Sequence, residues 1–442
     1  MESAGRDPLR EDDAEIYVAS TCFKTGPPGR VGVELEWLVV DSREPRSPVD
    51  PARVDSALTG VQPLTAKGWL TTEPGGQLEL STACAASLSA CLAAADRDLA
   101  RVRSALGVAG LCIHGDGLDP VRAPRRVLDL PRYRAMERFF DRTGPEGRLM
   151  MCSTASVQVS VDAGAESGPA VAGGDFRRRW ALLHAVAPVL VAAFANSPFA
   201  QGAPTGLRSS RAAVWARLDP SRTLPPPGAA DPDADPRAAY ARYALDARVL
   251  CIPAAGGGGR HGDPPEGLTF RDWLRDGGRT LRRPTRADLE FHLSTLFPPV
   301  RPRGWLELRV IDAQPVATWP VVAAVVAGLV EDDKAREAAF AATEPLRPLG
   351  AGRPGLSANH AALCRGVADP LLGKAARACV AAAVDALPRL GLNGRRLRQV
   401  MGWAERHTER GRCPADGRLD RYRRTGVAGW AGQDEDPSEE AA

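Results

Sequence analysis

The sequence lacks the segments that carry a protein to or through a membrane. Its first residues, MESAGRDPLREDDAE, mix acidic and basic side chains and contain no apolar core, so they do not have the pattern of a secretory signal. The most apolar runs, 181–195 and 316–330, are interrupted by His184, Pro188 and Pro320. Both are shorter than the roughly 20 residues that a spanning helix needs. We therefore expect a cytoplasmic protein with no membrane partner.

Several common catalytic and binding motifs are also missing. The nine cysteines are odd in number and include no C-x-x-C pair, which argues against a disulfide framework and a structural zinc site. There is no G-x-S-x-G nucleophile elbow. The glycine run 256–259 is not followed by Lys-Ser or Lys-Thr, so it is not a Walker A loop and is interpreted as a flexible loop.

Lysine is scarce, and arginine carries almost all of the positive charge. The formal net charge of the 442-residue chain is only +3, so no strong polyanion partner is implied. The arginine-rich segment 394–424 contains interspersed acidic residues and no nucleic-acid readout motif. We expect a solvated or intersubunit helical face there, and no nucleic-acid partner.

Four segments alternate apolar and polar residues, which is typical of strands with one buried face. They are 31–41, 69–81 (with a turn at Pro74-Gly75-Gly76), 150–162 and 305–312. Helical patterns cover 176–195, 285–296, 318–343, 367–387 and 394–410, together with a helix capped by Ser81-Thr82 that ends near 107–110. Because the strands are not continuously apolar, a parallel sheet is disfavoured. The sequence predicts a mixed α+β fold.

The predicted domain organisation is simple. We expect a flexible amino terminus over 1–14, one catalytic domain over 15–425 and a disordered acidic tail over 426–442. Two stretches rich in turn-forming residues, 224–236 and 254–267, are predicted to be long surface loops. No internal repeat is visible at solenoid or propeller periods.

Carboxylates gather on the polar faces of the predicted strands. Glu34 and Glu36 alternate with valine, leucine and tryptophan, Glu79 follows the turn after Glu73, and Glu307 alternates with leucine. A single Glu-x-Glu is more often a solvated sheet face. Here several predicted strands carry glutamate on the polar face, and no lysine on those faces neutralises the negative charge. If these faces converge, bound cations must supply positive charge, and Mg²⁺ suits carboxylate oxygens shared with phosphates.

Five ordered motifs carry a family resemblance: VGVELE, TTEPGGQLELS, MMCSTASVQVSVD, NSPFAQGAPTGLRSSRAAVW and RADLEFHLSTLFPPVRPRGWLELRVIDAQP. Together they resemble the glutamate-cysteine ligase family of the plant and bacterial type, over most of 31–326. The resemblance implies a glutamine-synthetase-like catalytic sheet, mainly antiparallel and funnel-shaped, surrounded by helices. It also implies ATP and Mg²⁺ as cofactors and L-glutamate and L-cysteine as substrates.

Site residues follow from the same resemblance. The expected metal ligands are Glu34, Glu36, Glu73, Glu79, Gln158 and Glu307, with glutamine standing at 158 where some relatives have histidine. Glu307 and Arg309 are the expected catalytic residues, and Arg309 contacts the transferring phosphate. Arg211 and Trp215, four residues apart on one helix face, are expected to recognise glutamate. Met151, Ser153, Thr154 and Tyr243 are expected to line the amino-acid pocket.

The implied reaction is ATP-dependent ligation through a γ-glutamyl phosphate, which gives γ-glutamylcysteine, ADP and phosphate. Within the family the sequence is most similar to the form that serves ergothioneine biosynthesis. Three alternatives stay open: a γ-glutamyl ligase that uses another amine, γ-glutamylcysteine supply for glutathione, and a non-catalytic regulator built on a decayed ligase. The oligomeric state is not predicted.

Overall fold

The computed structural model describes residues 9–26, 29–65, 67–166, 175–254, 261–350 and 357–430, except for the side chains of 348–350. The predicted glycine-rich loop at 256–259 and most of the predicted acidic tail lie outside these residues. None of the helices described is long and apolar enough to cross a membrane.

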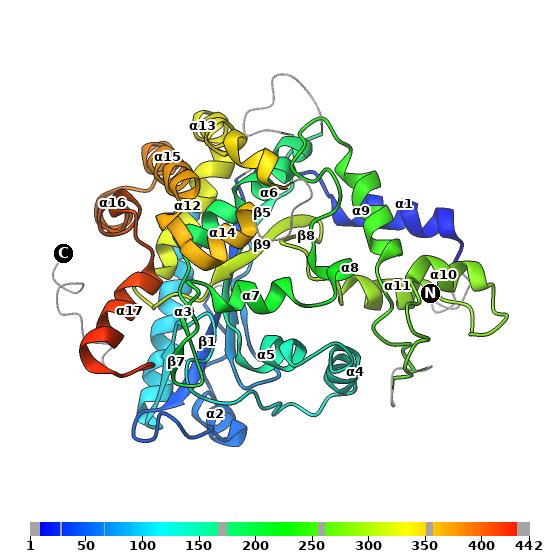
Figure 1. The fold of residues 1–442 in the computed structure, drawn as a ribbon, viewed down its shortest axis with the longest axis horizontal. Coiled ribbons are helices and arrows are strands. Elements are labelled where there is room, and N and C mark those ends of the chain that lie inside the picture. The colour runs from blue at the N-terminus through cyan, green and yellow to red at the C-terminus, as the bar shows by residue number, and fades with distance from the viewer. Residues whose placement is uncertain are drawn as a thin grey trace.

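The centre of the molecule is an antiparallel sheet (Figure 1). Across the sheet, the hydrogen-bonded strands follow the order β2, β3, β1, β5, β9 and β8. Strand β4 pairs with the carboxyl-terminal end of β1. All of these pairings are antiparallel, which confirms the mixed α+β prediction. The strands are β1 (Val31–Asp41), β2 (Trp69–Thr72), β3 (Leu78–Ser81), β4 (Leu111–His114), β5 (Ser156–Asp162), β8 (Val300–Pro302) and β9 (Trp305–Asp312), with a separate hairpin of β6 (Phe199–Ala200) and β7 (Ala203–Pro204).

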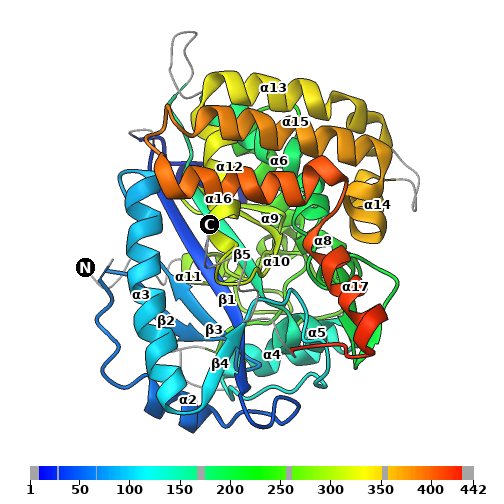
Figure 2. The same cartoon turned by 90° about the vertical axis from the view of Figure 1, so that its left-hand side faces the viewer.

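Helices cover one face of this sheet in two layers (Figures 1 and 2). Helices α3 (Leu88–Val108), α6 (Phe176–Ala193) and α12 (Trp319–Glu331) contact the strands directly. Helices α13 (Asp333–Thr343), α15 (Pro370–Ala386) and α16 (Gly394–Arg406) pack outside them. The core forms here because α6 and α12 are apolar over most of their surface, which is the property of a fully buried helix.

The remaining helices surround the sheet at its edges and ends (Figure 1). They are α1 (Glu11–Cys22), α2 (Pro51–Ala57), α4 (Pro131–Phe140), α5 (Glu146–Ser153), α7 (Ser210–Ala216), α8 (Pro220–Thr223), α9 (Pro236–Asp246), α10 (Phe270–Asp276), α11 (Arg286–Leu293), α14 (Ala358–Arg365) and α17 (Pro414–Thr425). Thr285 and Asp288 form a reciprocal capping box at the start of α11, which lies within the predicted helix 285–296.

Three predicted elements need correction. The segment 150–162 is a strand only from Ser156, because its first residues end α5, in which Gly147, Met150 and Met151 are buried at helical spacing. The helix after β3 begins at Leu88 and is capped by Ser87, because residues 82 and 85 still pair with β1. The predicted helix 318–343 is two helices, since Asp332 has extended backbone and caps α13.

The ordered part of the chain extends beyond the predicted domain limits at both ends. Helix α1 begins at Glu11, whose carboxylate accepts a hydrogen bond from Arg275, so residues 11–14 are part of a helix. At the other end, Trp430 is buried against His114, and the guanidinium of Arg122 lies 4.7 Å from its ring centroid. The predicted tail therefore begins too early, because residues 426–430 return to the sheet.

Candidate active site

The face of the sheet away from α3 and α12 carries the predicted carboxylates. Val33, Leu35 and Trp37 of β1 are buried in the core, so Glu34 and Glu36 project from the opposite face. Strand pairing then places Glu36 opposite Glu79 of β3, and Glu34 opposite Gln158 of β5. Residues from three different segments of the sequence therefore share one surface.

Glu73 joins this surface from the tight turn between β2 and β3. The turn is held by Gln77, whose amide nitrogen donates to the carbonyl oxygen of Thr154 at 2.8 Å and whose side-chain oxygen accepts from Gly75. The close approach also requires glycine at 75, because a Cβ there would lie 2.2 Å from the carbonyl oxygen of Cys152. Gln77 thus supports the turn from inside the protein and is not part of the site.

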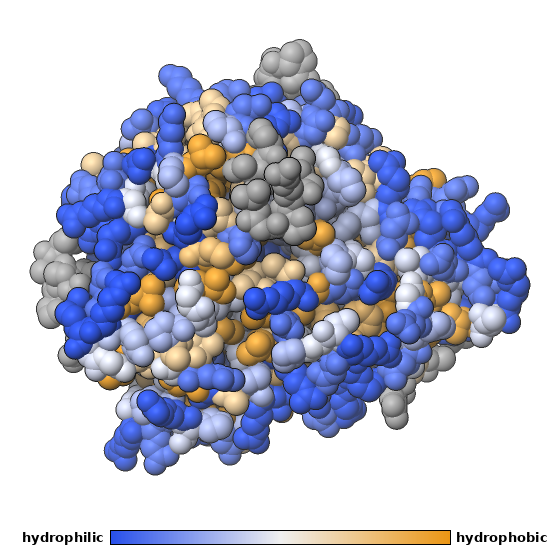
Figure 3. Space-filling view, in the orientation of Figure 1, coloured by the Kyte–Doolittle hydropathy of each residue, from blue (hydrophilic) through white to orange (hydrophobic). Residues whose placement is uncertain are grey.

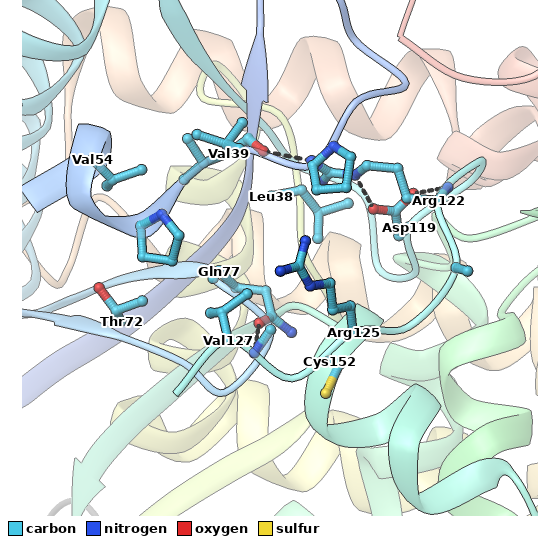
Figure 4. Close-up of a pocket in the computed structure, with 16 residues that line it drawn as sticks. Leu38, Val39, Val54, Thr72, Gln77, Asp119, Arg122, Arg125, Val127 and Cys152 are labelled. Carbon is cyan, nitrogen blue, oxygen red and sulfur yellow. Dashed lines mark hydrogen bonds and ion pairs between the residues drawn. The ribbon is translucent and has the colours of Figure 1, made fainter. Parts of the chain in front are cut away.

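A small cavity of about 50 Å³ lies beside the same turn (Figure 4). Val39, Val54, Val127 and Cys152 are among the residues that line it. The guanidinium of Arg122 closes one side by donating to Asp119 and to the carbonyl oxygen of Val39 (Figure 4). Its size is about that of one or two water molecules, so we assign it no substrate.

Glu307 of β9 is the most buried carboxylate of the face. Its Oε1 atom accepts a hydrogen bond from Arg301 at 2.8 Å and another from Arg309. Its Oε2 atom is equally buried and has no hydrogen-bond partner in the part of the chain that the structure describes. A buried carboxylate oxygen without a partner is costly, so Oε2 is ready to accept a cation.

Arg309 links Glu307 to the carboxylates of β1. It also donates to the side-chain oxygen of Gln158, whose amide nitrogen donates to Glu36 at 2.8 Å. A bulge brings Arg309 there: Val159 pairs with Leu308 and Val157 with Ile311, so β9 has one residue more than β5 between these pairs. Bulges re-aim side chains in this way.

Burial and crowding shift the pKa values of these carboxyl groups in opposite directions. Burial, followed by the charges of Glu307 and Glu79, raises the pKa of Glu34 to about 7. Burial, followed by Glu36 and Glu79, raises the pKa of Glu73 to about 8. Burial also disfavours the charge of Glu307, but Arg301 and Arg309 outweigh it and lower its pKa. The face therefore combines one carboxylate that arginines stabilise with others whose pKa burial and neighbouring carboxylates raise despite the charge of Arg309.

Arg211 and Trp215 lie beside this face on α7 (Ser210–Ala216). Arg211 is buried, its guanidinium carbon lies 5.7 Å from the Trp215 ring centroid, and its Nη2 atom donates to the carbonyl oxygen of Arg309 at 2.8 Å. Helix α7 is fixed to β9 at its start, where the hydroxyl of Ser209 donates to Asp312 at 2.9 Å. The same Asp312 also accepts hydrogen bonds from Asn196 and Ser197.

A cavity of about 530 Å³ opens on Arg211, Trp215 and Arg309. Most of its wall is apolar and comes from α6, α7, α14 and the segment 297–299, and apolar side chains gather near the centre of this face of the molecule (Figure 3). Arg347 adds a third arginine, and none of the described residues that line the cavity is Asp or Glu. Such a lining favours a small anionic ligand.

The other predicted pocket residues do not line this cavity. Met151 packs in an apolar cluster that Trp215 also touches. Ser153 is buried, and the hydroxyl of Thr154 donates back to the carbonyl oxygen of Met150 at 2.7 Å. Tyr243 packs against Tyr240, and its buried hydroxyl has no partner. The structure therefore separates these four residues from the cavity at Arg211.

Two residues of the site were not predicted. Arg301 faces Glu307 because β8 and β9 pair as a hairpin, and β8 is too short to show a strand pattern in the sequence. Asp312 is the last residue of β9, and the strand pattern of the sequence does not indicate that it is buried. Within the described residues, no three Asp, Glu, His or Cys side chains lie close enough together to share a metal ion as they stand. Arg309 lies among the carboxyl groups instead.

Crowded carboxylates and arginines on one buried face define a candidate enzyme that handles phosphate or carboxylate groups. The fold is that of a glutamate-cysteine ligase: a crystal structure of this enzyme from Francisella tularensis in complex with AMP aligns with a TM-score of 0.51, at 12% identity, over 91% of this chain and 86% of the other. The chain belongs to glutamate-cysteine ligase family 2, whose model matches residues 30–440.

Individual relatives agree with this family. The glutamate-cysteine ligase EgtA of Mycobacterium tuberculosis is 37% identical over 444 residues, which cover 96% of this chain and 94% of the relative. EgtA of Mycolicibacterium smegmatis is 37% identical, covering 94% and 93%. The chloroplastic glutamate-cysteine ligase of Arabidopsis thaliana is 30% identical, covering 77% and 67%.

Proposed function

We propose that the protein is an ATP-dependent ligase that joins the γ-carboxyl group of L-glutamate to the amine of L-cysteine. The products are γ-glutamylcysteine, ADP and phosphate. Family membership and the mycobacterial EgtA relatives support this reaction and favour ergothioneine biosynthesis as its pathway. The observation that carries the proposal is the direct bond between Arg211, beside an anion-favouring cavity, and Arg309, which lies within the carboxylate face.

The chemistry follows from the difficulty of forming an amide in water. A carboxylate is a poor electrophile, so the γ-carboxylate of glutamate first attacks the terminal phosphorus of ATP and ADP leaves. The cysteine amine then attacks the acyl carbon, loses a proton, and phosphate leaves. Arg309 is placed to stabilise charge on the transferring phosphoryl group, which is the main task in such reactions. No protein nucleophile is required.

Magnesium is the cation that this face fits. The partnerless Oε2 atom of Glu307 and the crowded carboxyl groups of Glu34 and Glu73 are oxygen donors that need positive charge. Glu36, Glu79 and Gln158 complete the proposed ligand set. When bound, Mg²⁺ would draw these carboxyl groups into their ionised form and neutralise the ATP phosphates.

Arg211 is proposed to bind the α-carboxylate of glutamate, because a guanidinium can bond both oxygens. Trp215 would cover the substrate from water. Met151, Ser153, Thr154 and Tyr243 stay proposals for the amino-acid site, although none of the four lines the cavity at Arg211. Met151 shares an apolar cluster with Trp215, which does line it. We further propose that the sheet is the glutamine-synthetase-like funnel, that one catalytic domain spans most of the chain, and that the enzyme works in the cytoplasm.

The test is product identification by mass spectrometry. Purified full-length protein is incubated with ATP, Mg²⁺, glutamate and an equimolar mixture of amino acids, with reactions lacking glutamate or ATP as controls. We expect γ-glutamylcysteine as the dominant product and phosphate release that needs both glutamate and cysteine. Equal turnover with alanine or glycine would reassign the amine, and no γ-glutamyl product would reject the function.

A further inference from the structure

Two of the nine tryptophans stand apart from the rest by their exposure. Trp69 and Trp305 are 52% and 41% exposed, whereas the other seven are buried or only partly exposed. Both exposed rings lie on the carboxylate face of the sheet. Trp69 is two residues from Thr71, whose hydroxyl donates to Glu79, and Trp305 is two residues from Glu307.

Trp305 begins the strand that carries Glu307 and Arg309. Because alternate residues of a strand share a face, Trp305, Glu307 and Arg309 form one row, about 13–14 Å long at the strand rise. Arg301 lies opposite Glu307 in the hairpin, and the guanidinium carbon of Arg303 lies 5.9 Å from the Trp305 ring centroid. Along its length the β8–β9 hairpin therefore presents the ring of Trp305 first, then the charged pair of Arg301 and Glu307, and finally Arg309.

The cavity at Arg211 lies at the other end of this row. Arg309 and Val310 of β9 line it, but Trp305 does not. In phosphoryl transfer the attacking and leaving oxygens are roughly in line, on opposite sides of the phosphorus. If glutamate occupies the cavity and the phosphoryl group lies at Arg309, the departing ADP must extend toward Trp305.

We propose that Trp305 stacks against the adenine of ATP and that Arg303 and Arg301 neutralise its phosphates between the base and Arg309. This assignment rests on the proposed function and adds the nucleotide subsite to it. A base stacks on an exposed indole at little entropic cost, because the ring is already held by the strand. The length of the row suits an extended nucleoside triphosphate whose terminal phosphate reaches Arg309.

The space beside Glu307, the next residue of the row after Trp305, agrees with an extended ligand. In β1, which is separated from β9 by β5, Gly32 lies opposite Ser160 of β5, which in turn lies opposite Glu307. A Cβ at Gly32 would meet Thr82 and Ser160 only at 3.6 and 3.8 Å, which are ordinary contact distances. Protein packing therefore does not demand glycine at this point, whereas close approach of a ligand does.

The proposal is tested by calorimetric titration of MgADP into the full-length enzyme. Trp305→Ala should weaken MgADP binding by about tenfold, because base–aromatic stacking contributes on that scale, and Trp305→Phe should restore most of it. Binding of magnesium tripolyphosphate, which has no base, should be unchanged by Trp305→Ala. In turnover assays the KM for ATP should rise by a similar factor while the KM for glutamate stays constant.

Trp69→Ala is the matched control, since Trp69 is also exposed on the same face but lies at the other edge of the sheet. It should bind MgADP like the wild type. The inference is overturned if Trp305→Ala binds MgADP normally, if it loses tripolyphosphate equally, or if Trp69→Ala has the larger effect. If the enzyme still makes γ-glutamylcysteine in any of these cases, the proposed function is retained and only the nucleotide subsite is rejected. A wild type that binds no MgADP would reject both.

Discussion

The Nη2 atom of Arg211 donates a hydrogen bond to the backbone carbonyl oxygen of Arg309 over 2.8 Å. These two residues are 98 positions apart in the chain and belong to α7 and β9. The bond sets the spacing between the arginine proposed for glutamate and the arginine proposed for the phosphoryl group. Because small displacements of reacting groups are costly in rate, this contact is the geometric centre of the proposed site.

Arg211→Lys should raise the KM for glutamate by about tenfold or more, because lysine keeps the charge but loses the bidentate fork. The KM for ATP should change by less than about twofold, since ATP is proposed to bind at the other end of β9. Steady-state kinetics with each substrate varied in turn will check this. Arg347→Lys is the control, because Arg347 lines the same cavity but is exposed and paired with Glu344. An unchanged glutamate KM in Arg211→Lys would remove Arg211 from the substrate site.

Single changes of Glu36, Glu79 and Glu307 to Gln should lower turnover by orders of magnitude. Each variant keeps nearly the same shape but loses charge that a hard cation requires. The measurement is phosphate release at saturating Mg²⁺, with Glu409→Gln as control, because Glu409 is exposed in the short 3-10 helix after α16. Turnover of the strand variants at the rate of this control would show that the carboxylate face does not bind metal.

Two Glu-to-Gln substitutions on the carboxylate face should have opposite effects on the stability of the metal-free protein. Glu73→Gln should hold or raise the melting temperature, because burial and neighbouring carboxylates disfavour its charge. Glu307→Gln should lower it, because Arg301 and Arg309 lose the charged partner that stabilises them. Thermal melts in EDTA will show the difference, and shifts of the same sign would contradict the electrostatic assignment.

The metal-free protein should lose stability as the pH rises from about 5 to 8. Glu34 and Glu73 have pKa values of about 7 and about 8, above the ordinary value of 4.5. In that window the folded state holds protons that the unfolded chain has released, so the free energy of unfolding falls with pH. Melting temperatures in EDTA should show the decline, and Glu73→Gln should reduce it. Saturating Mg²⁺ should oppose it, because the cation binds the ionised form. A melting temperature that rises over this range would contradict the assignment.

Trp430→Ala should destabilise the protein by about 3 kcal/mol, because it removes a buried aromatic ring from between His114 and Arg122. Chemical denaturation of the full-length chain will measure the loss. Trp69→Ala should change stability by less than about 0.5 kcal/mol, because Trp69 is half exposed. Equal effects of the two substitutions would show that residues 426–430 do not belong to the folded domain.

Strand positions were the features most accurately predicted from the sequence. The predicted boundaries of β1 and β9 agree with the structure at both ends. Apolar and polar residues alternate along both segments, and this two-residue period indicates a strand directly. The period failed at Met150 and Met151, where a short helix precedes β5 and a few residues satisfy either pattern. Arg301 was missed for a related reason, since three residues of β8 are too few to show a period.

The sequence by itself determined which side chains share a face, because alternation along a strand follows from local backbone geometry alone. It therefore placed Glu34 with Glu36, and Glu307 with Arg309, before any fold was known. Only the tertiary structure decided that β1, β5 and β9 are neighbours, that a bulge turns Arg309 toward Gln158, and that α7 holds Arg211 against β9. These arrangements depend on contacts between residues far apart in the chain. A local sequence pattern does not predict which of those contacts form.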